Sequence, residues 1–167
     1  MQPVTLRDAT GSDLPAINAI YNYFVVHSTC TFQIESETEA ARLAWFERHD
    51  AAHPVIVAVA GGEVIGWGAL SRFYTREAFR HTVENSVYVR PDCHRLGVGR
   101  QLLAELVSRA TALGQHAVMA AIDSAQAGSL ALHAGLGFVE VGRLREVGYK
   151  FGRWLDLVYM QRLLGAN

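Results

Sequence analysis

A β-prone run leads directly into a glycine-interrupted helix near the middle of this chain, and that junction constrains the fold most. Thr82 to Val89 is rich in β-branched and aromatic residues and predicts a strand. After a polar connection, Gly97 and Gly99 open a long amphipathic helix that Gly114 ends. Its apolar stripe consists of Leu102, Leu103, Leu106, Val107, Ala110 and Leu113. A strand that runs at once into such a helix is typical of a sheet carrying helices on its faces.

Three more helices and several strands are predicted around this junction. Cap residues at 10–13 precede a first helix that includes Leu14 and Phe24, and a second begins near Thr38 with Leu43 and Phe46 facing inward. The run 55–59 is continuously apolar, which is typical of a strand buried on both faces. Further strands are predicted at 4–7, 64–70, 117–122, 138–147 and 154–163, and a short helix at 124–135.

The order of these elements predicts an α/β or mixed α+β fold with one central mixed sheet. Hairpins dominate the first half, and a βαβ unit follows. The chain has 167 residues, half of them hydrophobic, and lacks repeats and Pro/Ser-rich linkers, so we expect one domain over 1–167. No segment approaches the roughly 18 unbroken apolar residues of a membrane helix.

Charge argues against a polyanionic partner. Fifteen Lys and Arg residues balance sixteen Asp and Glu residues, so no nucleic-acid partner is expected. A local excess of positive charge lies in 72–100, at Arg72, Arg76, Arg80, Arg90, Arg95 and Arg100. This segment indicates a small anionic ligand, with an ordinary solvated Arg-rich face as the alternative.

The two cysteines form no metal motif. Cys30 and Cys93 are 63 positions apart, so no metal site is expected. Cys93 lies near the glycine turn and is interpreted as a passive thiol, with a reactive nucleophile as the alternative. The N-terminal residues lack the apolar core of a signal peptide, which predicts a cytoplasmic protein with free thiols and no membrane association. Trp45 and Trp154 are interpreted as core residues.

The glycine turn has the features of a phosphate site. Free N–H groups at a helix start converge with the positive end of the helix dipole, and Arg95 and Arg100 add charge. A dinucleotide fingerprint is excluded because Leu102 occupies the third glycine position. A P-loop is excluded because Lys150, the only lysine, lies far away. Incidental glycines at a helix start are the alternative.

Arg95-x-Gly97-x-Gly99 resembles the pyrophosphate loop of the GCN5-related N-acetyltransferase (GNAT) superfamily, which binds coenzyme A. The usual arginine or glutamine of that loop is His94 here. The resemblance implies that acetyl-CoA is the cofactor. Its phosphates would be held by Arg95, Leu96, Gly97, Val98, Gly99 and Arg100.

Three more segments resemble the phosphinothricin and methionine sulfone acetyltransferase branch of that superfamily: Thr82 to Val89, Leu132 to Phe138, and Gly148 to Asp156. The resemblance covers nearly the whole chain. It implies a GNAT fold, with a central mixed, mostly antiparallel sheet flanked by about four helices. It also implies acetylation of a small amino-acid-like amine, and a homodimer.

The same resemblance places the rest of the cofactor. Backbone groups of Val87, Tyr88 and Val89 would pair with the pantetheine arm and polarise the thioester carbonyl. Gln126 and Ser129 would also contact the cofactor, with Gln126 standing where the family usually has Asn.

Two side chains are candidates for proton transfer. An amine must be neutral to attack a thioester, and a carboxylate in a β-prone run is costly to bury without a use, so Glu84 is the candidate base. The resemblance gives Glu84 the same role; an edge-strand glutamate facing water is the alternative. His133 can serve as acid for the leaving thiolate or as a second base, with a structural histidine as the alternative.

The resemblance assigns the acceptor to residues before and within the fourth strand, namely Tyr74, Thr75, Arg76, Glu84, Asn85 and Ser86. Arg76 or Arg80 can hold a carboxylate. Other functions stay open: a peptide or protein N-acetyltransferase, a non-catalytic acyl-CoA sensor, and a nucleotide-binding regulator.

Overall fold

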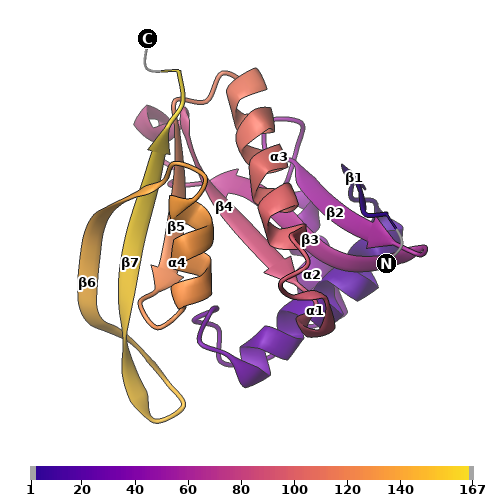
Figure 1. Ribbon diagram of the computed structural model, residues 1–167, viewed down its shortest axis with the longest axis horizontal. Coiled ribbons are helices and arrows are strands. Elements are labelled where there is room, and N and C mark those ends of the chain that lie inside the picture. Colours follow the sequence, from indigo (N-terminus) through magenta and orange to yellow (C-terminus); the bar gives the residue numbers. More distant parts are fainter. Residues whose placement is uncertain (1–2, 166–167) are drawn as a thin grey trace.

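Seven strands form one sheet in the computed structural model, which describes residues 3–165 (Figure 1). The strands are β1 Thr5–Asp8, β2 Val55–Ala60, β3 Glu63–Arg72, β4 Thr82–Val89, β5 Ala117–Asp123, β6 Val139–Lys150 and β7 Arg153–Leu163. Their order across the sheet is β1-β2-β3-β4-β5-β7-β6. Every pair is antiparallel except β4 with β5.

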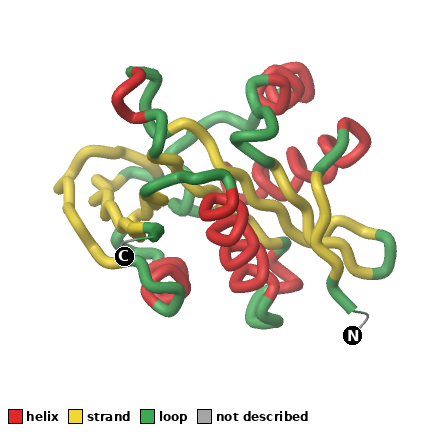
Figure 2. Tube along the Cα trace, turned by 90° about the horizontal axis from the view of Figure 1, so that it is seen from above, coloured by secondary structure: helices red, strands yellow, loops and turns green. Residues whose placement is uncertain are grey.

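Four α-helices accompany the sheet in the described part of the chain: α1 Leu14–His27, α2 Glu39–Glu47, α3 Val98–Ala112 and α4 Ala127–Ala134. They lie on both sides of the sheet (Figure 2). Residues of α1 pack with Val57 and Trp67, whereas residues of α3 pack with Ile56 and Val83. Alternate residues of β2 therefore face opposite cores, which confirms that this strand is buried on both faces. No helix among residues 3–165 is long and apolar enough to cross a membrane.

The sheet opens between its two central strands. Parallel pairing joins β4 to β5 only from Thr82 with Ala117 to Glu84 with Met119. Beyond that point β4 stays paired with β3 as far as Val89, while β5 stays paired with β7. The two strands diverge in Figure 1, and one edge of β4 is left without a neighbouring strand. Backbone N–H and C=O groups along such an edge can bind an extended chain.

The predicted fold class is confirmed, and the predicted elements match the observed ones to within a few residues. Three interpretations of single side chains were wrong. Leu43 is 46% exposed, because α2 turns Arg42 and Trp45 inward instead. Leu113 lies beyond the last turn of α3 and is 41% exposed. Trp154 is 62% exposed at the outer hairpin, where its ring packs against that of Tyr149, whereas Trp45 does pack against the core.

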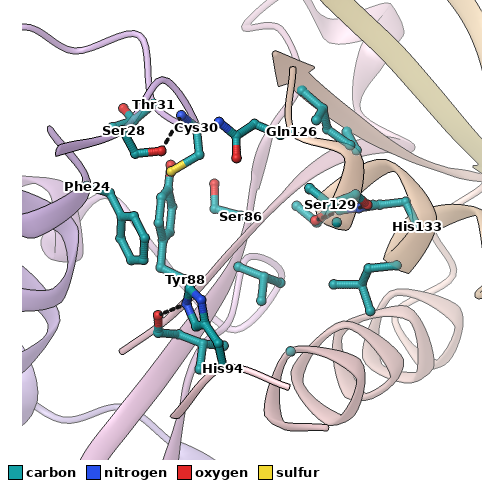
Figure 3. Close-up of a pocket in the computed structure, with 18 of the residues that line it drawn as sticks. Phe24, Ser28, Cys30, Thr31, Ser86, Tyr88, His94, Gln126, Ser129 and His133 are labelled. Carbon is teal, nitrogen blue, oxygen red and sulfur yellow. Dashed lines mark hydrogen bonds between the residues drawn. The ribbon is translucent and has the colours of Figure 1, made fainter. Parts of the chain in front are cut away.

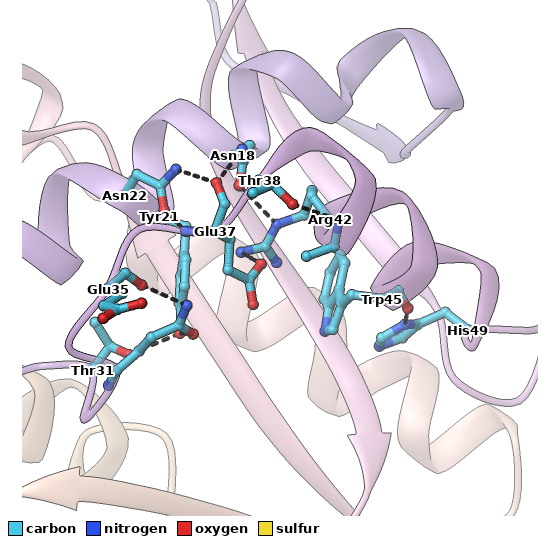
Figure 4. A network of polar contacts seen from close by, with 12 residues as sticks. Asn18, Tyr21, Asn22, Thr31, Glu35, Glu37, Thr38, Arg42, Trp45 and His49 are labelled. Carbon is cyan, nitrogen blue, oxygen red and sulfur yellow. Dashed lines mark hydrogen bonds and ion pairs between the residues drawn. The ribbon is translucent and has the colours of Figure 1, made fainter.

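Arg42 is buried because aromatic rings and one carboxylate surround it (Figure 4). Its guanidinium carbon lies 4.5 Å from the ring centroid of Tyr21 and 4.7 Å from that of Trp45. Its Nη2 lies 2.6 Å from Oε2 of Glu37. Paired charge and cation–π contacts offset the desolvation of the guanidinium. The guanidinium also lies 5.6 Å from the ring centroid of Trp67 in β3, so the segment between α1 and α2 is attached to the first half of the sheet.

The same segment is attached at its other end by Lys150, the last residue of β6. Its buried ammonium donates to the carbonyl oxygens of Ser28 (2.7 Å) and Thr31 (2.9 Å). Nearby, a Cβ on Gly148 would lie 2.5 Å from the ring of Phe32, so only glycine allows this approach. The outer hairpin thus fixes residues 28–32 over the open end of the sheet.

Replacing Lys150 should therefore destabilise the protein. We expect Lys150→Met to lower the free energy of unfolding by about 2–3 kcal/mol, because two inward carbonyls lose their donor. Urea unfolding measures the difference. Arg145→Met, which removes an exposed cation from the same strand, is the control and should change stability by less than about 0.5 kcal/mol. Equal stability of the two variants would show that the hydrogen bonds of Lys150 to Ser28 and Thr31 contribute nothing to stability.

Candidate active site

A cavity of about 820 Å³ occupies the opening between β4 and β5 (Figure 3). It is lined by β4 and β5, by the glycine turn before α3, by α4 and by the segment 28–32. Most of the predicted site residues line it, namely Glu84, Asn85, Ser86, Val87, Tyr88, Val89, Arg95, Gly97, Val98, Gly99, Arg100, Gln126, Ser129 and His133. Leu96 does not; its side chain is exposed at the surface.

The glycine turn presents backbone donors to this cavity. Gly97 caps α3 with φ +80°, a conformation that glycine adopts without strain. The first bond inside the helix runs from the Gln101 N–H to the Gly97 carbonyl, so the amides of Val98, Gly99 and Arg100 have no partner within the helix. Unpaired amides and the positive helix end make an anion site at one end of the cavity.

His94 closes the neighbouring end of β4. Its Nε2 lies 2.8 Å from the carbonyl oxygen of Val89 and therefore donates to it. Its ring stacks on Phe24 of α1 at a centroid distance of 6.0 Å. At the position where the resemblance expects arginine or glutamine, this chain thus has a side chain that is bonded to its own strand.

The side chain of Tyr88 anchors the part of β4 that has an unpaired edge. The ring of Tyr88 lies on the α1 side of the sheet and stacks on the ring of Trp67, with 4.9 Å between the ring centroids. Burial there raises the pKa of the Tyr88 phenol far above its usual range. The backbone from Ser86 to Val89 keeps its bonds to β3 on one side only. This edge leads from the glycine turn to Glu84.

Glu84 is half-buried and has no charged partner among residues 3–165. Strand alternation puts its side chain on the face that carries α1, and burial alone raises the pKa of its carboxyl. Tyr159 of β7 lies nearby: burial, Tyr74 and the charge of Glu84 together raise the pKa of its phenol. Tyr159 pairs with Ala121, which lines the cavity. No motif marks Tyr159; only the register of β7 against β5 reveals it.

His133 lies on the opposite face, at the end of α4. Its Nδ1 is 2.8 Å from the carbonyl oxygen of Ser129, and its Nε2 is 3.1 Å from Oδ1 of Asn85. The amide of Asn85 in turn donates to the carbonyl oxygen of Met119, at 2.9 Å. Burial lowers the pKa of His133, and the hydrogen bond to Ser129 opposes that shift. The side chain of Asn85 is thus bonded within the protein.

The other predicted acceptor residues lie elsewhere. Tyr74, Thr75 and Arg76 line a separate hollow of about 220 Å³, together with Arg72 and Arg80. The structure therefore gathers these arginines but does not bring them into the main cavity. Tyr74 nevertheless approaches Tyr159, and the ring of Phe73 packs against both.

Sequence reasoning missed the segment 28–32 as part of the site. Ser28, Cys30, Thr31 and Phe32 line the cavity (Figure 3). Thr29 accepts a hydrogen bond from Gln126 at 3.0 Å and donates to Asp123. These contacts join residues about a hundred positions apart, and no local pattern signals them. Among residues 3–165 no cluster of three or more His, Cys, Asp and Glu side chains is arranged to hold a metal.

Comparison with known proteins places the chain beside one family. The acetyltransferase (GNAT) family model matches residues 17–138. L-methionine sulfoximine/L-methionine sulfone acetyltransferase of Pseudomonas aeruginosa is 46% identical over 159 residues, covering 94% of this chain and 92% of that protein. The structure of yncA from Salmonella typhimurium, solved with acetyl-CoA, has a TM-score of 0.94 at 39% identity, covering 98% of this chain and 95% of that one. A phosphinothricin acetyltransferase from Sinorhizobium meliloti, also in complex with acetyl-CoA, has a TM-score of 0.94 at 41% identity, covering 97% of this chain and 89% of that one.

Proposed function

Because the chain belongs to the acetyltransferase (GNAT) family, it is an acetyl-CoA-dependent N-acetyltransferase, and we propose that its acceptor is the α-amine of a small amino acid or amino-acid analogue. Methionine sulfone, methionine sulfoximine and phosphinothricin are the acceptors we expect, since similar proteins are named for them. The observation that carries the proposal is a half-buried carboxylate, Glu84, whose pKa is raised by desolvation, at the end of a cavity that begins at a helix N-terminus.

The residues of the cavity fit the cofactor. The free amides of Val98, Gly99 and Arg100 suit a diphosphate, with Arg95 supplying further charge. The edge of β4 from 86 to 89 suits an amide-bearing arm, which can pair with it as a strand would. Gln126 and Ser129 border the same channel. When bound, acetyl-CoA supplies an activated acetyl group as a thioester.

Glu84 is proposed as the base. An amino-acid amine is largely protonated near neutral pH and needs an acceptor for its proton. The raised pKa of Glu84 makes its carboxylate a stronger base than an ordinary glutamate. Because Glu84 lies on the α1 face of the sheet, the acceptor is expected on that face, opposite His133. For His133 we propose that it exchanges a proton with the leaving sulfur or acts as a second base.

The acceptor itself is proposed to lie against Ser86 and the phenols of Tyr74 and Tyr159, beside Glu84. Its carboxylate is proposed to bind Arg76 or Arg80. Thr75 lies in the same hollow. The chain is proposed to act as one catalytic domain.

A homodimer in the cytoplasm is the proposed working form. The outer hairpin exposes a group of apolar side chains that a second copy would cover: Val139, Val141, Leu144, Val147, Tyr149 and Trp154. Acetyl-CoA as cosubstrate and two free cysteines are consistent with a reducing compartment.

A thiol-release assay tests the acceptor class. Purified enzyme with acetyl-CoA is expected to release coenzyme A with methionine sulfone, methionine sulfoximine and phosphinothricin, and mass spectrometry is expected to find the N-acetyl products. The α-hydroxy analogue of methionine, which lacks the amine, is the control and should give no turnover. Turnover of peptide N-termini without turnover of free amino acids would overturn the proposal.

A further inference from the structure

The imidazole of His133 lies between two oxygen atoms that can only accept hydrogen bonds. The carbonyl oxygen of Ser129 faces Nδ1, and Oδ1 of Asn85 faces Nε2. The orientation of the Asn85 amide is set by its other partner, because the carbonyl oxygen of Met119 requires the NH₂ group on its side. His133, Asn85 and Met119 are all buried where β4 and β5 part.

A neutral imidazole cannot satisfy both contacts. It carries one N–H, so one ring nitrogen would direct a lone pair at an oxygen atom. Turning the Asn85 amide around moves the conflict to Met119, where two oxygens would then face each other 2.9 Å apart. Only the doubly protonated ring gives every polar atom in the chain His133–Asn85–Met119 a complementary partner.

We propose that Asn85 is a positioning residue that holds His133 in the doubly protonated form, so that His133 is the acid of the reaction and not a second base. The inference rests on the proposed function. When the amine has attacked, its new N–C bond stays and the C–S bond of the thioester breaks. In the acid step the N–H bond at Nε2 then breaks, an S–H bond forms on the departing sulfur, and the ring becomes neutral. The ring then regains a proton from water. Two protons leave the ammonium nitrogen, one before and one after its attack, and Glu84 passes both to water.

On the described elements packed around His133, no carboxylate keeps its imidazole doubly protonated. Arg100 of α3 and Arg162 of β7 direct their guanidinium groups at carbonyls just after α4. On β4 and β5, Glu84 and Asp123 lie on the opposite face of the sheet. Burial lowers the pKa of the imidazole. The two hydrogen bonds to Ser129 and Asn85, which are charge-assisted when the ring is doubly protonated, oppose this shift.

Nitrogen-15 NMR of the cofactor-free enzyme tests the inference directly, with His133→Gln used to assign the signal. We expect both ring nitrogens of His133 to carry protons at neutral pH. In Asn85→Leu, which has nearly the same shape and no acceptor, the pKa of His133 should fall by at least about one unit, a tenfold change in protonation. Asn85→Asp restores an acceptor and should bring the pKa back to the wild-type value or above.

The pH dependence of kcat supplies the second readout. An acid must be protonated to act, so kcat should fall at high pH, and Asn85→Leu should move that fall to lower pH with little change in KM for acetyl-CoA. A wild-type ring with a single N–H at neutral pH, or the same pKa in wild type and Asn85→Leu, would overturn the inference. The NMR measurement needs no acceptor, so an incorrect acceptor class leaves its result unaffected.

Discussion

Glu84→Gln is expected to lower kcat by about 10²-fold, because the variant keeps the shape of the side chain and loses the base. For the wild type, kcat/KM should fall on the acid side at a pH above the usual carboxylate range, since burial raises the pKa of Glu84. The variant should lack that acid-side fall. A pH–rate profile of both proteins with methionine sulfone makes the comparison.

The same substitution should stabilise the fold at neutral pH. A carboxyl whose pKa is raised in the folded state holds its proton more tightly there, so stability falls as the pH rises through the window between the ordinary pKa and the raised one. Above that window the folded protein bears a desolvated charge, which Gln removes. Urea unfolding at pH 7.5 should therefore show Glu84→Gln to be more stable than wild type.

Glu47→Gln is the matched control for both measurements, because Glu47 is an exposed glutamate at the end of α2. It should leave kcat, the pH profile and the stability unchanged. A Glu84→Gln variant that keeps wild-type kcat, or that keeps the acid-side fall, would remove Glu84 from the mechanism.

Gly99→Asp should abolish most of the affinity for coenzyme A while leaving the fold intact. The added carboxylate would lie in the first turn of α3, where it stabilises the helix by interaction with its dipole. A Cβ at this position meets Leu132 and Val89 at 3.5 and 3.7 Å, which are ordinary contacts. The same carboxylate repels a diphosphate at that helix end, so we expect binding about 10²-fold weaker.

Gly99→Ala separates the steric effect from the charge. It adds the Cβ alone and should weaken binding much less than Gly99→Asp. Isothermal titration calorimetry with coenzyme A, at low and high salt, measures both, and the difference between the variants should shrink as salt screens the repulsion. Equal affinities of the Asp and Ala variants would place the diphosphate away from this turn.

The parts of the site that lie within one segment could be predicted from the sequence. Gly97 and Gly99 between a strand and an amphipathic helix indicate free amides at a helix start, and that is where the structure has them. Glu84 is notable as a carboxylate in a β-prone run, and the structure places it half-buried beside the cavity. Both inferences need only local geometry, so no knowledge of distant contacts is required.

Contacts between distant segments could not be predicted in this way. Asn85 is bonded to Met119 and His133 only because the pairing of β4 with β5 ends after three residue pairs. No residue pattern in either strand predicts where that pairing ends. Lys150 reaches Ser28 across 122 positions. Leu43 was expected inside because periodicity counts arginine as polar, whereas aromatic rings and Glu37 bury Arg42 in its place.

Hydrogen exchange of backbone amides, followed by NMR with and without acetyl-CoA, tests most directly the claim that the opened sheet is the site of acetyl transfer. The account predicts new protection in two places: the amides between Ser86 and Val89 that face β5, and those of Val98, Gly99 and Arg100. Protection confined to other parts of the chain, or none at saturating acetyl-CoA, would contradict it.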